Sequence, residues 1–330
     1  MVAPNGCQVP ALDWPDDTND RPSHRNSKVP SQELWSNEAI PGGPRASWRN
    51  VSLMSLRIAG IQMLPRLMQN ESNLGQMIDY LELSAREGAG LAIFPECALC
   101  GYCFESLQEA FPFAEPIPGP STLKVSEVCQ RLNIYSVFGL LEQADGRIFN
   151  AAVLIGPQGV VGKYRKIHLP GLGVDKYVQP GDLGFAVHET VHGRIGLNIC
   201  YDGAFPEASR IMALKGADLV VLPTNWPTGA EEFAEYLINA RGLENKIFYA
   251  AVNRVGVERG FRFIGRSRIV DIHGKTLAIA SPDQEEILYA EIDLLKARDK
   301  HVVRVPGKHE IHRFNDRRPE LYGELVQPRN

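Results

Sequence analysis

Three residues with complementary chemistry stand near the ends of three apolar runs. Cys200 follows residues 194–199 and precedes a helical pattern. A junction of strand and helix lifts a side chain clear of the sheet and leaves a backbone N–H beside it. A structural cysteine has the same sequence surroundings, because Cys is among the most buried residue types. As a nucleophile, this thiol needs a base or a cation nearby.

Glu96 and Lys166 could supply those two groups. Glu96 follows the apolar run 91–94 and a proline, which places a carboxylate at the edge of the sheet where α/β proteins keep their sites. Lys166 follows the strand-like residues 160–164, and alternation points Lys166 and Arg165 to opposite faces. A helix cap or surface acid for Glu96, and a solvated strand end for Lys166, are the alternatives. One acid, one ammonium and one thiol together are what acyl transfer by a thiol requires.

Apolar runs alternate with amphipathic stretches through most of the chain, which is typical of α/β architecture. A Pro/Gly turn at 157–159 joins two consecutive strands as a hairpin and predicts a mixed sheet. Helices are expected over 70–87, 120–132, 206–216 and 230–246. Strands are expected over 56–62, 91–94, 134–141, 148–155, 160–164, 194–199, 218–222 (ending at Pro223), 247–252, 264–272, 275–280 and 287–292.

Composition divides the chain into three parts. Residues 1–53 are rich in Pro, Asn, Asp, Ser and Arg without an apolar period, which predicts a disordered or loosely attached extension. Residues 54–295 show no break and are expected to form one catalytic domain. Residues 296–330 are expected to form an arm that packs on the core or on a partner subunit.

The bulk numbers exclude several classes of protein. With 330 residues, 44% of them hydrophobic, the chain can bury a large core. A net charge of -4 without a basic stripe argues against nucleic acid as a partner. Because no apolar run approaches the roughly 20 residues of a membrane span and no leader pattern is present, a cytoplasmic protein without membrane attachment is expected.

Six cysteines stand at positions 7, 97, 100, 103, 129 and 200, and reduced thiols are expected because a chain of this size needs no stapling. The spacing of Cys97, Cys100 and Cys103 also suits an iron–sulfur or zinc site. A fourth ligand is missing, since Leu107 occupies the position where a ferredoxin-type cysteine would fall. No metal is therefore expected.

Four short blocks resemble the signature blocks of the nitrilase superfamily of carbon–nitrogen hydrolases, in the family's order and spacing. The similarity runs from about Leu56 to about Arg318. The blocks are Phe94-Pro95-Glu96 with Gly101-Tyr102; Tyr164-Arg165-Lys166-Ile167-His168-Leu169; Pro180-Gly181-Asp182; and Asn198-Ile199-Cys200-Tyr201-Asp202 with Phe205-Pro206-Glu207.

The resemblance implies a four-layer αββα sandwich, paired subunits in a homodimer or larger homo-oligomer, and a catalytic triad of Glu96, Lys166 and Cys200 with no cofactor. The backbone N–H of Tyr201 would face the oxyanion beside Lys166. Tyr102, Phe205, Asn225 and Trp226 are expected as walls of the substrate pocket. His168 is expected to pack locally, and three residues that match a family helix near the site are expected to be structural: Arg241, Glu244 and Asn245.

One departure from the family pattern concerns a second glutamate that many members carry six positions before the Pro of Pro-Gly-Asp. This chain has Val174 there, followed by Asp175. Gly171 and Gly173 allow turns that other residues resist, so the loop could bring Asp175 into the vacant position. The alternative is a solvated Asp175 that pairs with Lys176 or with nothing.

The expected substrate is a small amide or carbamoyl amine. Tyr201-Asp202 after the nucleophile resembles amidase and carbamoylase branches, whereas nitrile-preferring sequences commonly have Trp-Glu. The 259–266 and 315–318 segments resemble some archaeal small-nitrile hydrolases, so a nitrile substrate is the first alternative. A catalytically silent binding protein on the same fold is the second.

Overall fold

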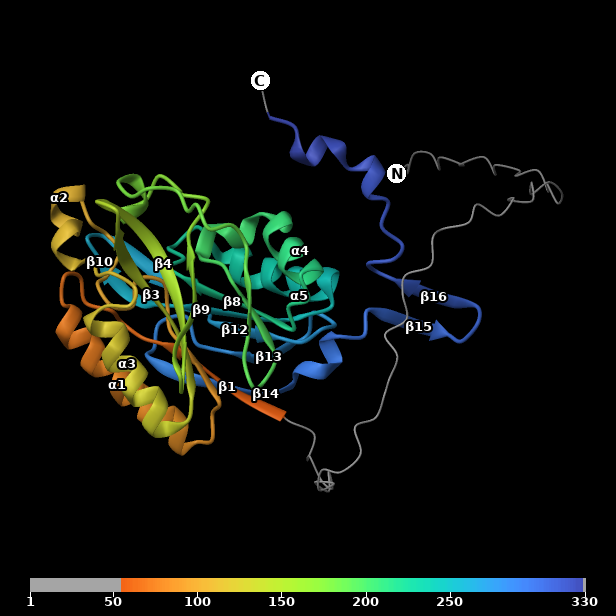
Figure 1. The fold of residues 1–330 in the computed structure, drawn as a ribbon, viewed down its shortest axis with the longest axis horizontal. Helices are drawn as coiled ribbons and strands as arrows, with labels where there is room; N and C mark the ends of the chain where they lie inside the picture. The colour runs from red at the N-terminus through yellow and green to blue at the C-terminus, as the bar shows by residue number, and fades with distance from the viewer. Residues whose placement is uncertain (1–54, 329–330) are drawn as a thin grey trace, which may run out of the picture. The chain divides into compact units, whose positions relative to one another are not determined.

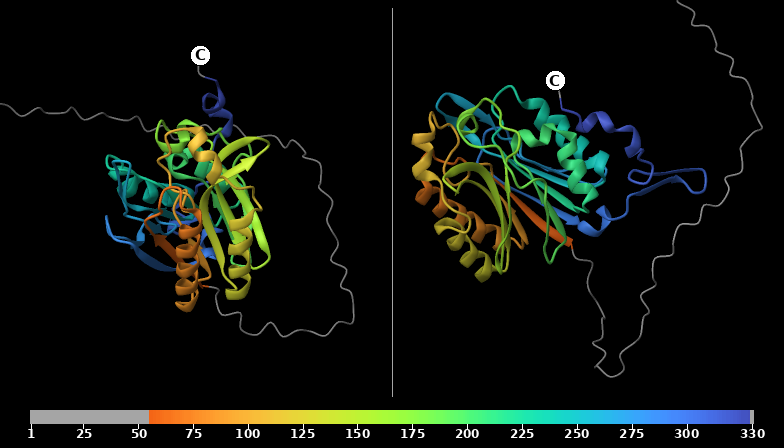
Figure 2. Two further views of the ribbon diagram at one scale, coloured as in Figure 1. Left: turned by 90° about the vertical axis from the view of Figure 1, so that its left-hand side faces the viewer. Right: turned by 45° about the horizontal axis from the view of Figure 1, so that its top comes forward.

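The computed structural model describes residues 55–328, and the expectations for residues 1–53 lie outside this range. Two six-stranded sheets pack face to face (Figure 1). Helices α1 and α3 cover the outer face of one sheet, and α4 and α5 cover the outer face of the other (Figures 1 and 2). The four-layer αββα sandwich is therefore confirmed. Its helices are α1 Asn70–Arg86, α2 Leu107–Ala110, α3 Pro120–Leu132, α4 Pro206–Leu214 and α5 Ile238–Asn245.

The first sheet has the order β14-β1-β2-β3-β4-β5. Its strands are β1 Ser55–Gln62, β2 Leu91–Ile93, β3 Tyr135–Ala144, β4 Arg147–Gly156, β5 Gly159–Arg165 and β14 Glu286–Asp293. β2 runs parallel to both β1 and β3, while the β3–β4 and β4–β5 pairs are antiparallel. The sheet is mixed, as the predicted hairpin requires.

The second sheet has the order β13-β12-β9-β8-β7-β6. Its strands are β6 Val187–Glu189, β7 Arg194–Leu197, β8 Leu219–Thr224, β9 Phe248–Asn253, β12 Arg268–Val270 and β13 Thr276–Ile279. The central strands β7, β8 and β9 are parallel, so their carboxyl ends lie at one edge of the sheet. Such an edge is where α/β proteins commonly place a site.

Alternation along the strands assigns side chains to two different cores. On β1, Ile58 packs between the sheets, whereas Ala59 and Ile61 pack beneath the helices. On β2, Leu91 and Ile93 face the second sheet, and Ala92 faces α1 and α3. A strand buried on both faces has a continuous apolar sequence, which explains the unbroken apolar run at β2.

Two strand predictions were wrong at their ends. β8 continues through Pro223 to Thr224. A proline has no N–H to donate, but β7 ends at Leu197, opposite Val221, so β7 does not pair with β8 at Pro223. Residues 264–272 are not one strand, since β11 Phe261–Ile264 pairs with β10 Val255–Glu258, and β12 begins only at Arg268.

The helix expected over 230–246 contains a π-helical segment, Phe233–Leu237, which continues directly into α5. Such a segment shifts the side chains that follow it around the helix axis and is frequent near functional sites. The C-terminal segment contains the hairpin of β15 His301–Val305 and β16 His309–His312, which the sequence reading missed. Beyond it, Phe314 packs against a buried apolar cluster that includes residues of α4 and α5.

Among residues 55–328, none of the helices combines the length and the apolar character needed to cross a membrane.

Gly139 on β3 lets the turn after β2 lie directly on the sheet. A Cβ atom at position 139 would lie 2.3 Å from the backbone nitrogen of Cys97 and 2.6 Å from Cα of Glu96. Backbone atoms fixed by the sheet cannot yield as a flexible side chain can. Gly139 therefore sets where Glu96 stands.

We expect Gly139→Ala to destabilise the protein by about 1–3 kcal/mol, because the new methyl group meets backbone atoms. The matched control is Gly75→Ala on α1, where nothing lies within 4 Å of the new Cβ. This control should raise the free energy of unfolding by about 0.5–1 kcal/mol. Urea unfolding measures both, and an unchanged Gly139→Ala would contradict the close approach.

Candidate active site

The three predicted chemical groups stand at three strand ends. Glu96 follows β2, which ends at Ile93, and Lys166 directly follows β5. Cys200 follows β7 and opens a 3-10 turn, Cys200–Ala204, which precedes α4. β2 and β5 belong to one sheet and β7 to the other, so the packing of the two sheets brings the three residues together.

The ammonium of Lys166 lies between two carboxylates. Its Nζ is 2.6 Å from Oε1 of Glu96 and 2.5 Å from Oδ2 of Asp175. The side chains of all three residues are completely buried. A buried ammonium needs such partners, since an isolated charge in the interior is strongly unfavourable. The structure thus places Asp175 in contact with Lys166.

Two further side chains hold the carboxylates in place. The amide of Asn150 on β4 donates to Glu96 at 2.7 Å and to Asp175 at 2.8 Å. The hydroxyl of Tyr102 donates to Asp175 at 2.7 Å. Asn150 was not predicted as a site residue, although a single Asn inside the otherwise apolar run 148–155 could have indicated one. Oε2 of Glu96 has no hydrogen-bond partner among the described residues.

These contacts shift the pKa values of the buried groups. Burial raises the pKa of Glu96, the Asp175 carboxylate adds to the rise, and Lys166 opposes it. Burial lowers the pKa of Lys166, but the Asp175 and Glu96 carboxylates outweigh that effect and hold the pKa well above its ordinary value. Burial and the Glu96 charge raise the pKa of the Cys200 thiol to about 12. Cys200 therefore needs a base to lose its proton near pH 7.

The turn at Cys200 is held by polar contacts on both sides. Cys200 has a positive φ of 46°, which is uncommon outside glycine and typical of functional turns. Asp202 accepts hydrogen bonds from the backbone N–H of Ile199 and the hydroxyl of Tyr164. The guanidinium of Arg241 donates to the carbonyls of Gly203 and Ala204 at the end of the turn.

The short loop after Lys166 adopts the turn that its glycines allow. Gly173 has a φ of 55°, and a Cβ there would lie 2.6 Å from the ring of Tyr102. The loop then forms the 3-10 turn Gly173–Lys176. Val174 is buried with apolar neighbours, while Asp175 points to Lys166 and Asn150.

An apolar cavity of about 180 Å³ opens beside Cys200. It includes three of the four expected wall residues, Tyr102, Asn225 and Trp226, together with Tyr201. The whole lining is Tyr102, Pro170, Leu172, Cys200, Tyr201, Asn225, Trp226, Pro227, Ala230 and Phe233.

Phe205 differs from its expected place, because it does not line this cavity. Its ring stacks on His168 with 3.6 Å between centroids, and Nδ1 of His168 lies 2.7 Å from Asp202. Asp202 thus fixes His168, and His168 holds Phe205 away from the cavity. The expectation of local packing for His168 agrees with these contacts.

Arg165 faces away from Lys166, as alternation predicts. Its guanidinium pairs with Glu142 at 2.7 Å and with Asp182 at 2.7 Å. The backbone of Gly181 donates to the carbonyl of Lys166, and a Cβ there would lie 2.1 Å from the carbonyl oxygen of Arg165. The Pro-Gly-Asp block therefore packs directly against the strand end that carries Lys166.

The three clustered cysteines are packed rather than exposed. Cys97, Cys100 and Cys103 lie in one apolar cluster with Val174, and the Sγ of Cys97 is 3.6 Å from Oδ1 of Asn150. The five cysteines in the described range are free thiols. Within that range, no group of three or more His, Cys, Asp or Glu side chains is arranged to hold a metal ion.

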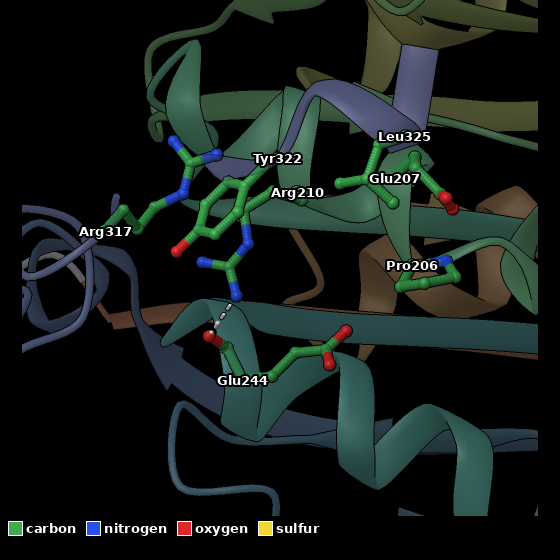
Figure 3. A pocket seen from close by; sticks show the side chains of 7 residues that line it. All are labelled: Pro206, Glu207, Arg210, Glu244, Arg317, Tyr322 and Leu325. Atoms are coloured by element: carbon green, nitrogen blue, oxygen red, sulfur yellow. Dashed lines mark hydrogen bonds between the residues drawn. The ribbon is translucent and has the colours of Figure 1, made fainter. Parts of the chain in front are cut away.

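A larger hollow of about 280 Å³ lies between α4, α5 and the C-terminal segment (Figure 3). Arg210 reaches across it beside Tyr322 and donates to the backbone carbonyl of Glu244. Arg317 and Leu325 come from the C-terminal segment. The described residues that line this hollow include no thiol and none of the predicted catalytic groups.

Known proteins resemble the chain along most of its length. Residues 57–301 match the family model for carbon–nitrogen hydrolases. The chain is 38% identical over 269 residues to a nitrilase of Pyrococcus abyssi, covering 81% of this chain and 99% of the relative. It is 32% identical over 290 residues to the human omega-amidase, covering 84% of this chain and 100% of the relative.

Solved structures agree with this result. A carbon–nitrogen hydrolase from Helicobacter pylori superposes with a TM-score of 0.74 at 28% identity, covering 83% of this chain and 99% of that chain. An amidase from Nesterenkonia has the same fold, with a TM-score of 0.68 at 24% identity over 82% of this chain and 96% of that chain. The chain belongs to the carbon–nitrogen hydrolase family of the nitrilase superfamily, and its resemblance to that family is confirmed.

We expect Lys166→Met to abolish turnover, because the variant keeps most of the apolar stem but removes the ammonium between Glu96 and Asp175. Arg165→Met, one residue earlier, should keep measurable turnover and lose thermal stability, since it breaks the pair with Glu142. Steady-state kinetics and thermal melts measure both variants. The reverse order of damage to turnover would show that the assignment of faces is wrong.

Proposed function

We propose that the protein hydrolyses a small amide through a thioester on Cys200, with Glu96 as general base and Lys166 as oxyanion stabiliser. The observation that carries the proposal is the Glu96–Lys166–Asp175 contact beside a thiol that lines a cavity. The carbon–nitrogen hydrolase family to which the chain belongs supports it.

In the first step, Glu96 accepts the thiol proton while the sulfur forms a bond to the amide carbon. The unpartnered Oε2 of Glu96 is suited to receive that proton, because Oε1 is already engaged by Lys166 and Asn150. The Lys166 ammonium and the backbone N–H of Tyr201 stabilise the developing oxyanion, and one such donor is typically worth about 2.7–4 kcal/mol.

The carbon–nitrogen bond then breaks, and the nitrogen leaves as ammonia or an amine with the proton that Glu96 returns. Water attacks the thioester in the second step, and Glu96 takes one of its protons. The carboxylic acid leaves and the thiol of Cys200 is restored. The protons balance over the cycle with Glu96 alone as the carrier.

Asp175 is the fourth acting group in this proposal. It binds the Lys166 ammonium together with Glu96, and the two carboxylates share the Asn150 amide. Asp175 therefore positions the ammonium, where many relatives have a glutamate one residue earlier.

A nitrile substrate is the second candidate, and the 38% identity to a protein named nitrilase favours it. The same thiol can attack a C≡N carbon. Tyr201-Asp202 after the nucleophile favours the amide.

An ammonia-release assay tests the proposal on short aliphatic amides, carbamoyl amines and nitriles. We expect turnover of the amides that is abolished by Cys200→Ala, because a methyl group replaces the attacking sulfur while the packing loses little. Turnover of nitriles alone would select the second candidate. No release from any of the three classes would indicate a binding protein on this fold.

We expect Asp175→Asn to slow acylation at least tenfold, about 1.4 kcal/mol, because the ammonium loses one of its two carboxylates. The Asp175 charge raises the pKa of Glu96. Removing it should lower that pKa, so the acidic limb of the pH profile of kcat/KM should move to lower pH.

The matched control for this variant is Asp182→Asn, which also neutralises an aspartate but acts on Arg165 at the opposite face. It should change stability and leave the acidic limb in place. Pre-steady-state kinetics with unchanged acylation in Asp175→Asn would remove Asp175 from the mechanism.

A further inference from the structure

Among residues 55–328, no charged side chain lines the cavity beside Cys200. Its lining consists of aromatic, aliphatic and proline side chains with one amide, one thiol and the indole of Trp226. The Tyr102 hydroxyl already hydrogen-bonds with Asp175 and with the carbonyl of Leu172. The wall therefore offers no cation to a negatively charged substrate.

The buried charges next to the cavity also disfavour a negatively charged substrate. Two carboxylates, Glu96 and Asp175, stand against the single ammonium of Lys166, which leaves a formal charge of −1 when both acids are ionised. All three side chains are buried, so water screens this charge poorly. A carboxylate on the substrate would lose its hydration and meet this negative field.

The polar groups left over in the wall are neutral. Both amide atoms of Asn225 and the Nε1 of Trp226 are buried and have no hydrogen-bond partner among the described residues. These amide and indole groups carry no charge, and their burial leaves the surface of the cavity almost entirely apolar. Asn253 fixes this part of the wall by bonding to the backbone of Trp226 on both sides.

The volume of the cavity favours a short acyl group. A cavity of about 180 Å³ has room for about six water volumes of ~30 Å³ each. Trp226 and Phe233, with ring centroids 6.4 Å apart, form one wall. Phe233 is the first residue of the π-helical segment, so the start of the 230–246 helix forms part of this wall.

We infer that the enzyme selects uncharged amides with a short apolar acyl group and rejects amides whose acyl group ends in a carboxylate. This inference rests on the proposed function and adds the charge and size of the acyl group to it. The selection comes from the uncharged cavity wall and from the two buried carboxylates, which outnumber the single ammonium of Lys166.

A matched pair of substrates isolates the charge. Succinamide and succinamate have the same shape and differ only in a terminal carboxamide or carboxylate, and butyramide is the apolar reference. We expect kcat/KM for succinamate to lie at least 100-fold below that for succinamide, with butyramide the best of the three. Equal values for succinamate and succinamide would overturn the inference while the proposed function stands.

A pair of variants tests whether the wall is the cause. Ala230→Arg brings a cation to the rim of the cavity and should raise the ratio of succinamate to succinamide kcat/KM at least tenfold. Tyr236→Arg adds the same charge six residues later at a side chain that is 68% exposed, and the ratio should not change. An equal rise in both variants would assign the effect to overall charge and overturn the inference.

Two further outcomes are decisive. If Ala230→Arg does not fold, the wild-type comparison of the two succinic amides decides alone. If the wild type releases no ammonia from butyramide or from either succinic amide and forms no covalent adduct on Cys200, the proposed function fails and the inference fails with it.

Discussion

The ammonium of Lys166 and the carboxylates of Glu96 and Asp175 touch one another, and all three side chains are completely buried. Removing an ammonium from water costs several kcal/mol, and the cost is offset only when oppositely charged groups stand in good geometry. The three residues come from the end of β5, the turn after β2 and the loop after Lys166. The charge contact therefore holds three separate backbone segments at fixed distances from one another.

The rest of the site depends on this contact. Burial and the Glu96 charge raise the pKa of the Cys200 thiol while Lys166 opposes the rise, and the resulting pKa of about 12 keeps the sulfur protonated until a base acts. Gly139 and Gly181 allow the backbone to pass close behind Glu96 and Lys166. Neither carboxylate can relax toward solvent, because Asn150 ties both of them to β4.

The sequence was sufficient to predict that Glu96, Lys166 and Cys200 each stand just after a strand. Alternation alone assigned Lys166 and Arg165 to opposite faces, since a strand residue has only two directions to point. The glycines of the 170–176 loop left open whether Asp175 reaches inward or is solvated, and in the structure it contacts Lys166. These predictions succeeded because each depends on the backbone within a few residues.

Contacts between residues far apart in the sequence could not be predicted from such local patterns. Glu258 binds the backbone N–H groups of Tyr102 and Cys103 from more than 150 positions away, and Asn253 supports Trp226 across the end of the second sheet. Phe205 was expected in the cavity wall but stacks on His168, because Asp202 holds that imidazole. Such outcomes depend on how the two sheets pack, which no local pattern encodes.

The proposed mechanism requires Cys200 to carry the acyl group beside the Lys166 ammonium. The most direct measurement is rapid-quench peptide mass spectrometry with an aryl ester of butyric acid, whose leaving group departs so readily that acylation outruns hydrolysis. We expect one butyryl group on the peptide that contains Cys200, formed before the steady state and lost as butyrate appears. Product formation with that peptide unmodified at every time point, or with the acyl group on another residue, would contradict it.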